Sequence, residues 1–320
     1  MALKEPVTFR AGCIIERNYL YVAAKPNSLD SEEEYSRMFF YDGQNSSAPW
    51  VRHDLPNWTV VSVCVFKDMH DGTRKYAALS KHGEIEYTWP GGSVIETIDG
   101  AGLKEAHGPA YGYTSSIREI DGVLHACGTG GQVYRRGQDG WSHIAESLKS
   151  PAGLGSTEAI GQHDFSDFDG FGLGDIYVAS GNGEIHHFDG KTWQRCQTAT
   201  TEILTAIHCA DGNDVWACGF NGVLLRGNSQ DGFAAISSGS DTAIFTTITR
   251  FENKTYIGSS EGLFVYDDQN DCVKRVAADL AETCLVLDVK DGVLWSFGYD
   301  DIVSFNGKTW VRLEHPDNVP

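Results

Sequence analysis

The pattern from which the fold can be predicted is clearest in Asp214-Val-Trp-Ala-Cys-Gly-Phe-Asn-Gly-Val-Leu-Leu-Arg226. Two short apolar runs, 215–218 and 223–225, flank the tetrad Gly219-Phe-Asn-Gly222. Glycine and asparagine accept the positive φ of a tight turn, so the stretch predicts a β-hairpin whose turn is the tetrad. Runs this short are typical of strands, and no long stretch of the chain has helical periodicity.

The same tetrad recurs along the chain as Gly or Ser, two variable residues, then Gly or Asp. An apolar run precedes each copy, and an apolar residue follows two positions after it. The tetrad ends are 48, 52, 39, 40 and 39 residues apart, and their mean of about 44 lies within the range of β-propeller blades. The copies are Ser80–Gly83, Gly128–Gly131, Ser180–Gly183, Gly219–Gly222, Ser259–Gly262 and Gly298–Asp301.

A seventh unit lies near the N-terminus. Phe40-Tyr-Asp-Gly43 matches His187-Phe-Asp-Gly190 and Ser304-Phe-Asn-Gly307, which places a degenerate turn near Ser36 after a strand at Tyr19–Ala24. A tryptophan of the outer strand also recurs, at Trp50, Trp141, Trp193 and Trp310.

The repeats predict an all-β protein with a single domain over residues 1–320: a seven-bladed β-propeller of four-stranded blades. Six or eight blades are the alternatives. Such blades cannot bury both faces alone, whereas radial packing buries them and leaves short edges. Ring closure stays open, because Val7–Arg10 could either join the last blade, ending at Trp310–Leu313, or lie against it.

Two repeats carry a family resemblance. Residues 175–193 and 214–226 resemble repeats of the sialidase-type (BNR-like, Ycf48-like) β-propellers, and the similarity extends over residues 60–313. Gly190-Lys-Thr-Trp193 and Gly307-Lys-Thr-Trp310 fit the second half of the sialidase Asp-box, although the Asp is displaced by one position. The resemblance implies the fold and leaves the function open.

The charge of the chain limits its partners. It has 44 acidic and 25 basic residues among 320, a net charge of −19. This charge repels phosphates, so nucleic acid is an improbable partner and a basic protein is favoured. Apolar runs are too short to span a membrane. The residues after Met1 lack a signal-peptide core, so we expect a cytoplasmic location.

The eight cysteines contain no CxxC pair and no Cys/His cluster with zinc spacing. Most lie in apolar runs, which predicts small buried side chains in a reducing compartment. The alternative is a disulfide between Cys209 and Cys218, which flank a predicted turn; it would require an oxidising location.

Three long insertions fall on one predicted face of the propeller. Lys25–Arg37, Asp99–Tyr113 and Glu146–Thr157 connect strands at the ends where the tetrads lie. Long loops are often functional, although tolerated surface loops are an equal alternative. The candidate partner-binding residues on this face are Asp30, Glu32, Glu33, Glu34, Tyr35, His82, His107, Tyr111, Asn182, Asn221, Glu261 and Asp300.

The stretch His163–Gly174 is expected on the opposite face. Asp164, Asp167 and Asp169 offer oxygen ligands for calcium, but the spacing lacks the full loop motif and its closing Glu. The alternating phenylalanines fit a protein contact equally well. His186 and His187 point to opposite sides of a strand, so a shared metal is not expected. No metal or cofactor is predicted beyond the weak calcium candidate.

Two functions compete. The first is a non-catalytic protein-binding propeller, in its sharper form an immunity protein that neutralises a basic toxin such as a nuclease; a scaffold for several partners is a variant of it. The second is an enzyme or carbohydrate-binding module in which His82, His107, Tyr111, Glu261 and Asp300 bind a small molecule or glycan at the central funnel. No catalytic motif is present, which favours the first function.

Overall fold

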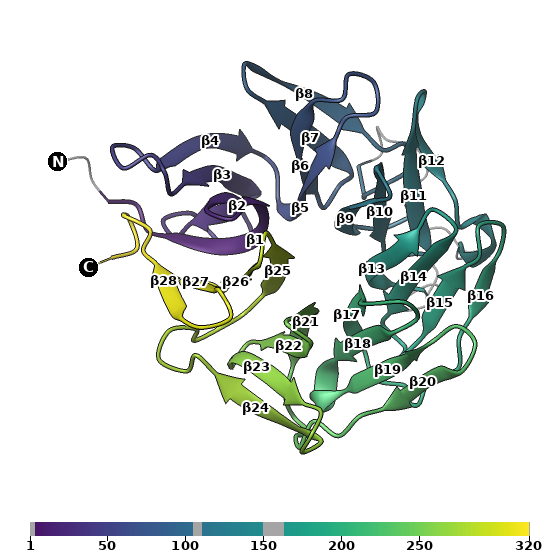
Figure 1. Ribbon diagram of the computed structural model, residues 1–320. Helices are drawn as coiled ribbons and strands as arrows, with labels where there is room; N and C mark the ends of the chain where they lie inside the picture. The colour runs from purple at the N-terminus through teal and green to yellow at the C-terminus, as the bar shows by residue number, and fades with distance from the viewer. Residues whose placement is uncertain (1–3, 105–110, 150–162, 320) are drawn as a thin grey trace.

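The computed structural model describes residues 4–104, 111–149 and 163–319. Seven sheets, each of four antiparallel strands in sequence order, stand around a central axis (Figure 1). The first strand of each sheet contacts the first strands of both neighbouring sheets, and β1 meets β25 where the ring closes. The predicted all-β, seven-bladed propeller is therefore confirmed.

The blades follow one another without strand exchange. Blades one to four are β1 (Val7–Glu16), β2 (Tyr19–Pro26), β3 (Tyr35–Asp42), β4 (Trp50–Pro56); β5 (Val60–Lys67), β6 (Arg74–Ser80), β7 (Glu84–Trp89), β8 (Gly92–Thr97); β9 (Thr114–Ile120), β10 (Val123–Gly128), β11 (Gln132–Gly137), β12 (Gly140–His143); and β13 (Phe165–Gly172), β14 (Asp175–Ser180), β15 (Ile185–Phe188), β16 (Trp193–Arg195). Blades five to seven are β17 (Leu204–Cys209), β18 (Val215–Gly219), β19 (Leu224–Asn228), β20 (Gly232–Ala235); β21 (Phe245–Phe251), β22 (Lys254–Ser259), β23 (Gly262–Asp267), β24 (Cys272–Val276); and β25 (Val286–Lys290), β26 (Val293–Phe297), β27 (Ile302–Phe305), β28 (Trp310–Leu313). Within the described ranges, the single 3₁₀ turns η2 (Glu146–Leu148) and η3 (Phe220–Gly222) lie between strands.

The tetrads form the turns between second and third strands, as the sequence predicts. Their last glycine has a positive φ in five copies, and at Gly222 a Cβ atom would lie 2.0 Å from the Ser240 carbonyl oxygen. No side chain fits there, which explains the recurrence of glycine. In blade one the prediction is wrong in detail, because Ser36 lies inside β3 and the turn is the longer loop 27–34.

In five blades, the turn between the third and fourth strands has the same side-chain cap. The Asp189 carboxylate accepts hydrogen bonds from the Lys191 and Thr192 amides at 2.9 and 2.7 Å. Asn306 repeats this pattern in blade seven. An Asx cap satisfies turn amides that the strands cannot reach, so the displaced Asp-box residue has a structural role here. Its other copies are Asp42, Asn228 and Asp267.

The core lies between neighbouring blades. In one cluster, Phe9 and Leu20 of blade one pack with Trp295 and Phe297 of blade seven, all at most 5% exposed. Alternating strand residues face the two neighbouring blades, so each sheet is covered on both sides.

The stretch His163–Gly174 differs from the expectation, because most of it is the inner strand β13 and not a loop of the opposite face. A β-bulge between Phe165 and Asp167 changes the alternation. Phe165 and Phe168 therefore both face the core, while Asp167 and Asp169 share the other side.

The cysteines do not form the disulfide considered as an alternative. Cys209 lies opposite Val215 and Cys218 opposite Ala206, so the two thiols are not cross-strand partners. All eight thiols are free and seven are buried. In the described part of the chain, no helix is long and apolar enough to cross a membrane.

Candidate functional site

One face of the ring carries the long connections. Loops between second and third strands, and between the last strand of one blade and the first of the next, meet there because strands alternate in direction. We call it the loop face. It contains the tetrads, the loop 27–34 and the described parts of two longer connections, residues 98–104 with 111–113 and residues 144–149 with 163–164.

The loop 27–34 is acidic and has a defined conformation. The Lys25 ammonium donates to the carbonyl oxygens of Ser31 and Glu33 at 2.9 and 2.5 Å, and the Asp30 carboxylate accepts the Glu32 amide at 3.0 Å. The side chains of Asp30, Glu32 and Glu33 are exposed. The chain therefore presents carboxylates to solvent from a fixed backbone.

Glu34 joins this loop to blade two. Its Oε1 lies 2.7 Å from Lys81 Nζ and 3.2 Å from His82 Nε2. The His82 Nδ1 in turn accepts the Leu103 amide at 3.3 Å, so three connections meet at one histidine. Burial alone would raise the pKa of Glu34, but the hydrogen bonds from Lys81 and His82 outweigh it and lower that pKa. Glu34 and His82, both predicted from the sequence, are thus neighbours.

Lysines of the loop face contact aromatic rings or carboxylates. Lys81 lies 5.2 Å from the centre of the Tyr113 ring, and Lys149 lies 4.6 Å from that of Tyr111. Lys104 forms an ion pair with Glu84. By contrast, these exposed carboxylates form no ion pair with any described residue: Asp30, Glu32, Glu33, Glu261 and Asp300.

The other predicted residues are spread over the ring. Asn182, Asn221, Glu261 and Asp300 lie in the turns of four successive blades, and all are exposed. Asn221 has φ 54 and donates to Glu202 at 2.7 Å. Tyr35 begins β3, opposite Pro56. His107 lies outside the described residues. The predicted residues are therefore dispersed over the loop face, and Glu34 and His82 form one close pair among them.

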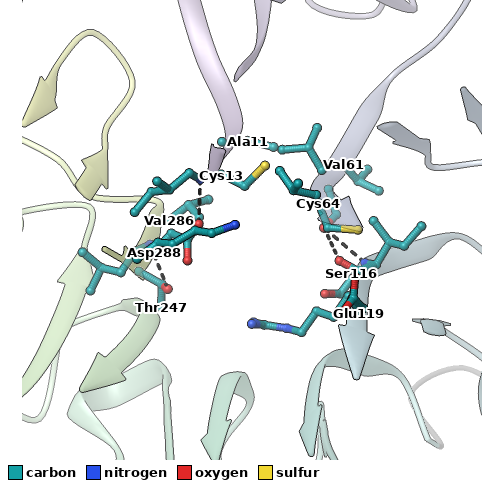
Figure 2. Close-up of a pocket in the computed structure, with 18 of the residues that line it drawn as sticks. Ala11, Cys13, Val61, Cys64, Ser116, Glu119, Thr247, Val286 and Asp288 are labelled. Carbon is teal, nitrogen blue, oxygen red and sulfur yellow. Dashed lines mark hydrogen bonds between the residues drawn. The ribbon is translucent and has the colours of Figure 1, made fainter. Parts of the chain in front are cut away.

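An axial channel of about 280 Å³ runs between the inner strands. Figure 2 shows Ser116, Glu119, Thr247 and Asp288 around its opening, on strands from three blades. Burial raises the pKa of Asp288. None of the funnel candidates His82, Tyr111, Glu261 and Asp300 lines this channel.

Sequence reasoning missed a set of inner-strand side chains, which we call the inter-blade belt: Ser62, Ser116, Asp167, Thr247 and Asp288. Each bonds to the next inner strand. Asp288, for example, accepts the Ile14 amide at 2.7 Å, and Thr247 accepts the Leu287 amide at 3.3 Å. All five stand two residues after the first residue of their strand. The sequence signal that could have revealed this set is a polar residue repeated at the third position of the inner strands.

Asp167 and Asp169, considered as calcium ligands, have protein partners. Asp167 accepts the Arg118 guanidinium at 2.9 Å, and Asp169 lies 3.2 Å from His208 Nδ1. Burial opposes ionisation of Asp169, but His208 and Arg118 lower its pKa. Asp164 instead accepts the Gly130 amide. The three carboxylates are not brought together as one ligand set.

Known proteins share this architecture. No protein-family model matches the chain. The immune protein Tsi7 of Pseudomonas aeruginosa is 33% identical to it over 265 residues, which is 82% of each chain. This chain belongs to the Tsi7 immune-protein family.

Solved structures of proteins with low sequence identity have the same fold as this Tsi7-family protein. The WD40 propeller domain of Doa1 superimposes with a TM-score of 0.65 at 12% identity, covering 98% of this chain and 95% of the other. Ycf48, solved bound to D1 peptide, also gives 0.65 at 12% identity, covering 98% and 94%. The expected resemblance to Ycf48-like propellers is confirmed at the level of the fold.

Among the described residues of this Tsi7-family propeller, one group brings three potential metal ligands within 4.8 Å of one another: His163, Glu184 and His186. His187 points away to Asp175, 2.7 Å distant, as the alternation of the strand predicts. Sequence reasoning missed the group because His163 lies 21 residues before Glu184, in another connection.

Proposed function

We propose that this chain is an immunity protein that binds a protein toxin and neutralises it. The observation that carries the proposal is the 33% identity to immune protein Tsi7 over 82% of both chains. The propeller supports it as well, because seven blades bring many loops to one rigid face, a common arrangement for protein binding.

We place the toxin on the loop face and infer that its contact surface is basic. Asp30, Glu32 and Glu33 are exposed on an ordered loop, and the net charge is −19. Complementary charge accelerates encounter and disfavours wrong partners. Neutralisation in the cytoplasm is part of the proposal, since eight free thiols fit a reducing compartment.

The first experiment uses the tagged protein as bait in lysate of its native cells, with mass spectrometry of retained proteins at low and high salt. We expect one stoichiometric basic protein whose retention weakens at high salt. A variant with Asp30→Asn, Glu32→Gln, Glu33→Gln and Glu34→Gln should bind that protein at least about tenfold more weakly at low salt.

The matched control removes four exposed carboxylates from the opposite face, by Asp121→Asn, Asp139→Asn, Asp211→Asn and Asp268→Asn. It changes the net charge equally and should bind as the wild type does. Equal binding by all three proteins would contradict the acidic loop as the contact. Retention of no protein by the wild type would contradict the immunity function.

A further inference from the structure

A histidine–carboxylate cluster lies on blade four at the loop face, apart from the acidic loop of blade one. His163 precedes β13, Glu184 follows the glycine of the tetrad turn, and His186 lies in β15. We propose that these three side chains form a binding site for a divalent transition metal of the zinc type.

The spacing of the cluster suits such an ion. His163 Nδ1 lies 3.3 Å from Glu184 Oε2, and His186 Nε2 lies 3.9 Å from the same oxygen. The two imidazole centres are 5.2 Å apart. Tetrahedral ligands at about 2.0–2.2 Å from zinc are roughly 3.3–3.6 Å from one another, so small side-chain adjustments would complete the geometry.

Burial leaves polar atoms of the cluster unsatisfied. His163 Nδ1 is buried and, although it lies 3.3 Å from Glu184 Oε2, it forms no hydrogen bond with a described residue. The Nδ1 of His186, on the other side of the ring from the Nε2 that faces Glu184, also has no partner among the described residues. His186 is only 3% exposed. An unpaired buried nitrogen costs free energy, and an ion bound to His163 Nδ1 would offset that cost.

The surroundings hold the ligands in place. His163 has φ 58, a conformation that non-glycine residues seldom adopt, and its carbonyl oxygen accepts the Gly131 amide at 2.8 Å. Arg195 Nη1 lies 3.0 Å from Glu184 Oε1, which leaves Oε2 toward the histidines. The guanidinium charge opposes cation binding, but its side chain is 61% exposed and well solvated.

The donor set selects the class of metal. Two imidazole nitrogens and one carboxylate oxygen suit zinc and its neighbours in the first transition row, whereas calcium and magnesium prefer oxygen ligands throughout. Three protein ligands leave a fourth position for water.

The test uses the whole chain freed of metal with a chelator and then titrated with Co²⁺. We expect one equivalent to bind with the visible absorption of tetrahedral Co²⁺, and Zn²⁺ to displace it. His163→Gln and Glu184→Gln should each weaken binding at least about 100-fold and abolish the zinc-induced rise in Tm.

His187→Gln is the matched control, because His187 is adjacent in sequence yet binds Asp175. It should keep the absorption and the zinc-induced rise in Tm. Circular dichroism establishes that each variant is folded. The proposal is overturned if the wild type binds no more Co²⁺ or Zn²⁺ than His163→Gln and Glu184→Gln do, or if His187→Gln loses the signal equally.

Discussion

At the scale of single residues, Asp301 is the exception among the tetrads. It stands where five other copies end in glycine and is only 3% exposed. Its Oδ2 accepts the Glu282 amide at 3.2 Å, while Oδ1 is buried and has no hydrogen-bond partner among the residues that the structure describes. Burial raises the pKa of Asp301 to about 6. The folded protein therefore holds this proton more tightly than the unfolded chain does.

Asp301→Asn should stabilise the protein at neutral pH. Because the folded pKa is raised, ionisation of Asp301 destabilises the fold increasingly as pH rises from about 4 to 6, and the penalty is constant above that. We expect a gain of up to about 3 kcal/mol in the free energy of unfolding at pH 8. Urea denaturation of both proteins at pH 4, 6 and 8 measures it. A difference that does not shrink toward pH 4 would contradict the assignment to this carboxyl.

At the same scale, the sequence shows which turn residues the backbone requires but not which side chains meet. The positive φ of Gly222 is local, so the repeat predicts it. The contact of Glu34 with His82 spans 48 residues and depends on how neighbouring blades pack. Single-sequence reasoning placed both on one face and could not pair them.

At the scale of elements, β13 connects three blades. Asp167 accepts the Ser116 hydroxyl and the Arg118 guanidinium from blade three, and the Ile207 amide of blade five at 3.3 Å. The sequence suggested calcium for this strand, because closely spaced carboxylates fit a metal as well as an arginine. The partners lie about 40 to 50 residues away, beyond any local pattern.

Asp167→Ala should destabilise the protein by about 2–3 kcal/mol, because it leaves a partly exposed guanidinium, the Ser116 hydroxyl and a buried amide without their acceptor. Glu16→Gln is the control: it removes the exposed pair with Arg74 and should cost less than about 1 kcal/mol. Urea denaturation of the two variants gives both values. Similar losses in the two would mean that the inter-blade belt contributes no more than a surface pair.

At the scale of the whole molecule, the repeat period predicts the number of blades. It does not predict which blade contains the N-terminal strand or how the first and last blades meet. The sequence left Val7–Arg10 as a possible addition to the last blade, and the structure makes it the start of the inner strand of blade one. Closure then depends on contacts between blades one and seven. Phe9 donates its amide to the Tyr299 carbonyl at 2.8 Å, and Arg17 donates its amide to Asp291 at 3.1 Å.

The Asn318 side chain connects the two ends of the chain directly. Its Oδ1 accepts the Val7 amide at 2.8 Å, and its Nδ2 donates to the Val7 carbonyl oxygen at 2.9 Å. Asn318→Ala should therefore cost about 1–2 kcal/mol and open the seam between blades one and seven first. Hydrogen exchange measured by mass spectrometry should show faster exchange in β1 and unchanged exchange in β17.

Asn306→Ala, which removes a turn cap in blade seven, is the control and should leave β1 protected. Equal acceleration of β1 and β17 in Asn318→Ala would mean that the ring opens as a whole and that this seam is not its weakest boundary.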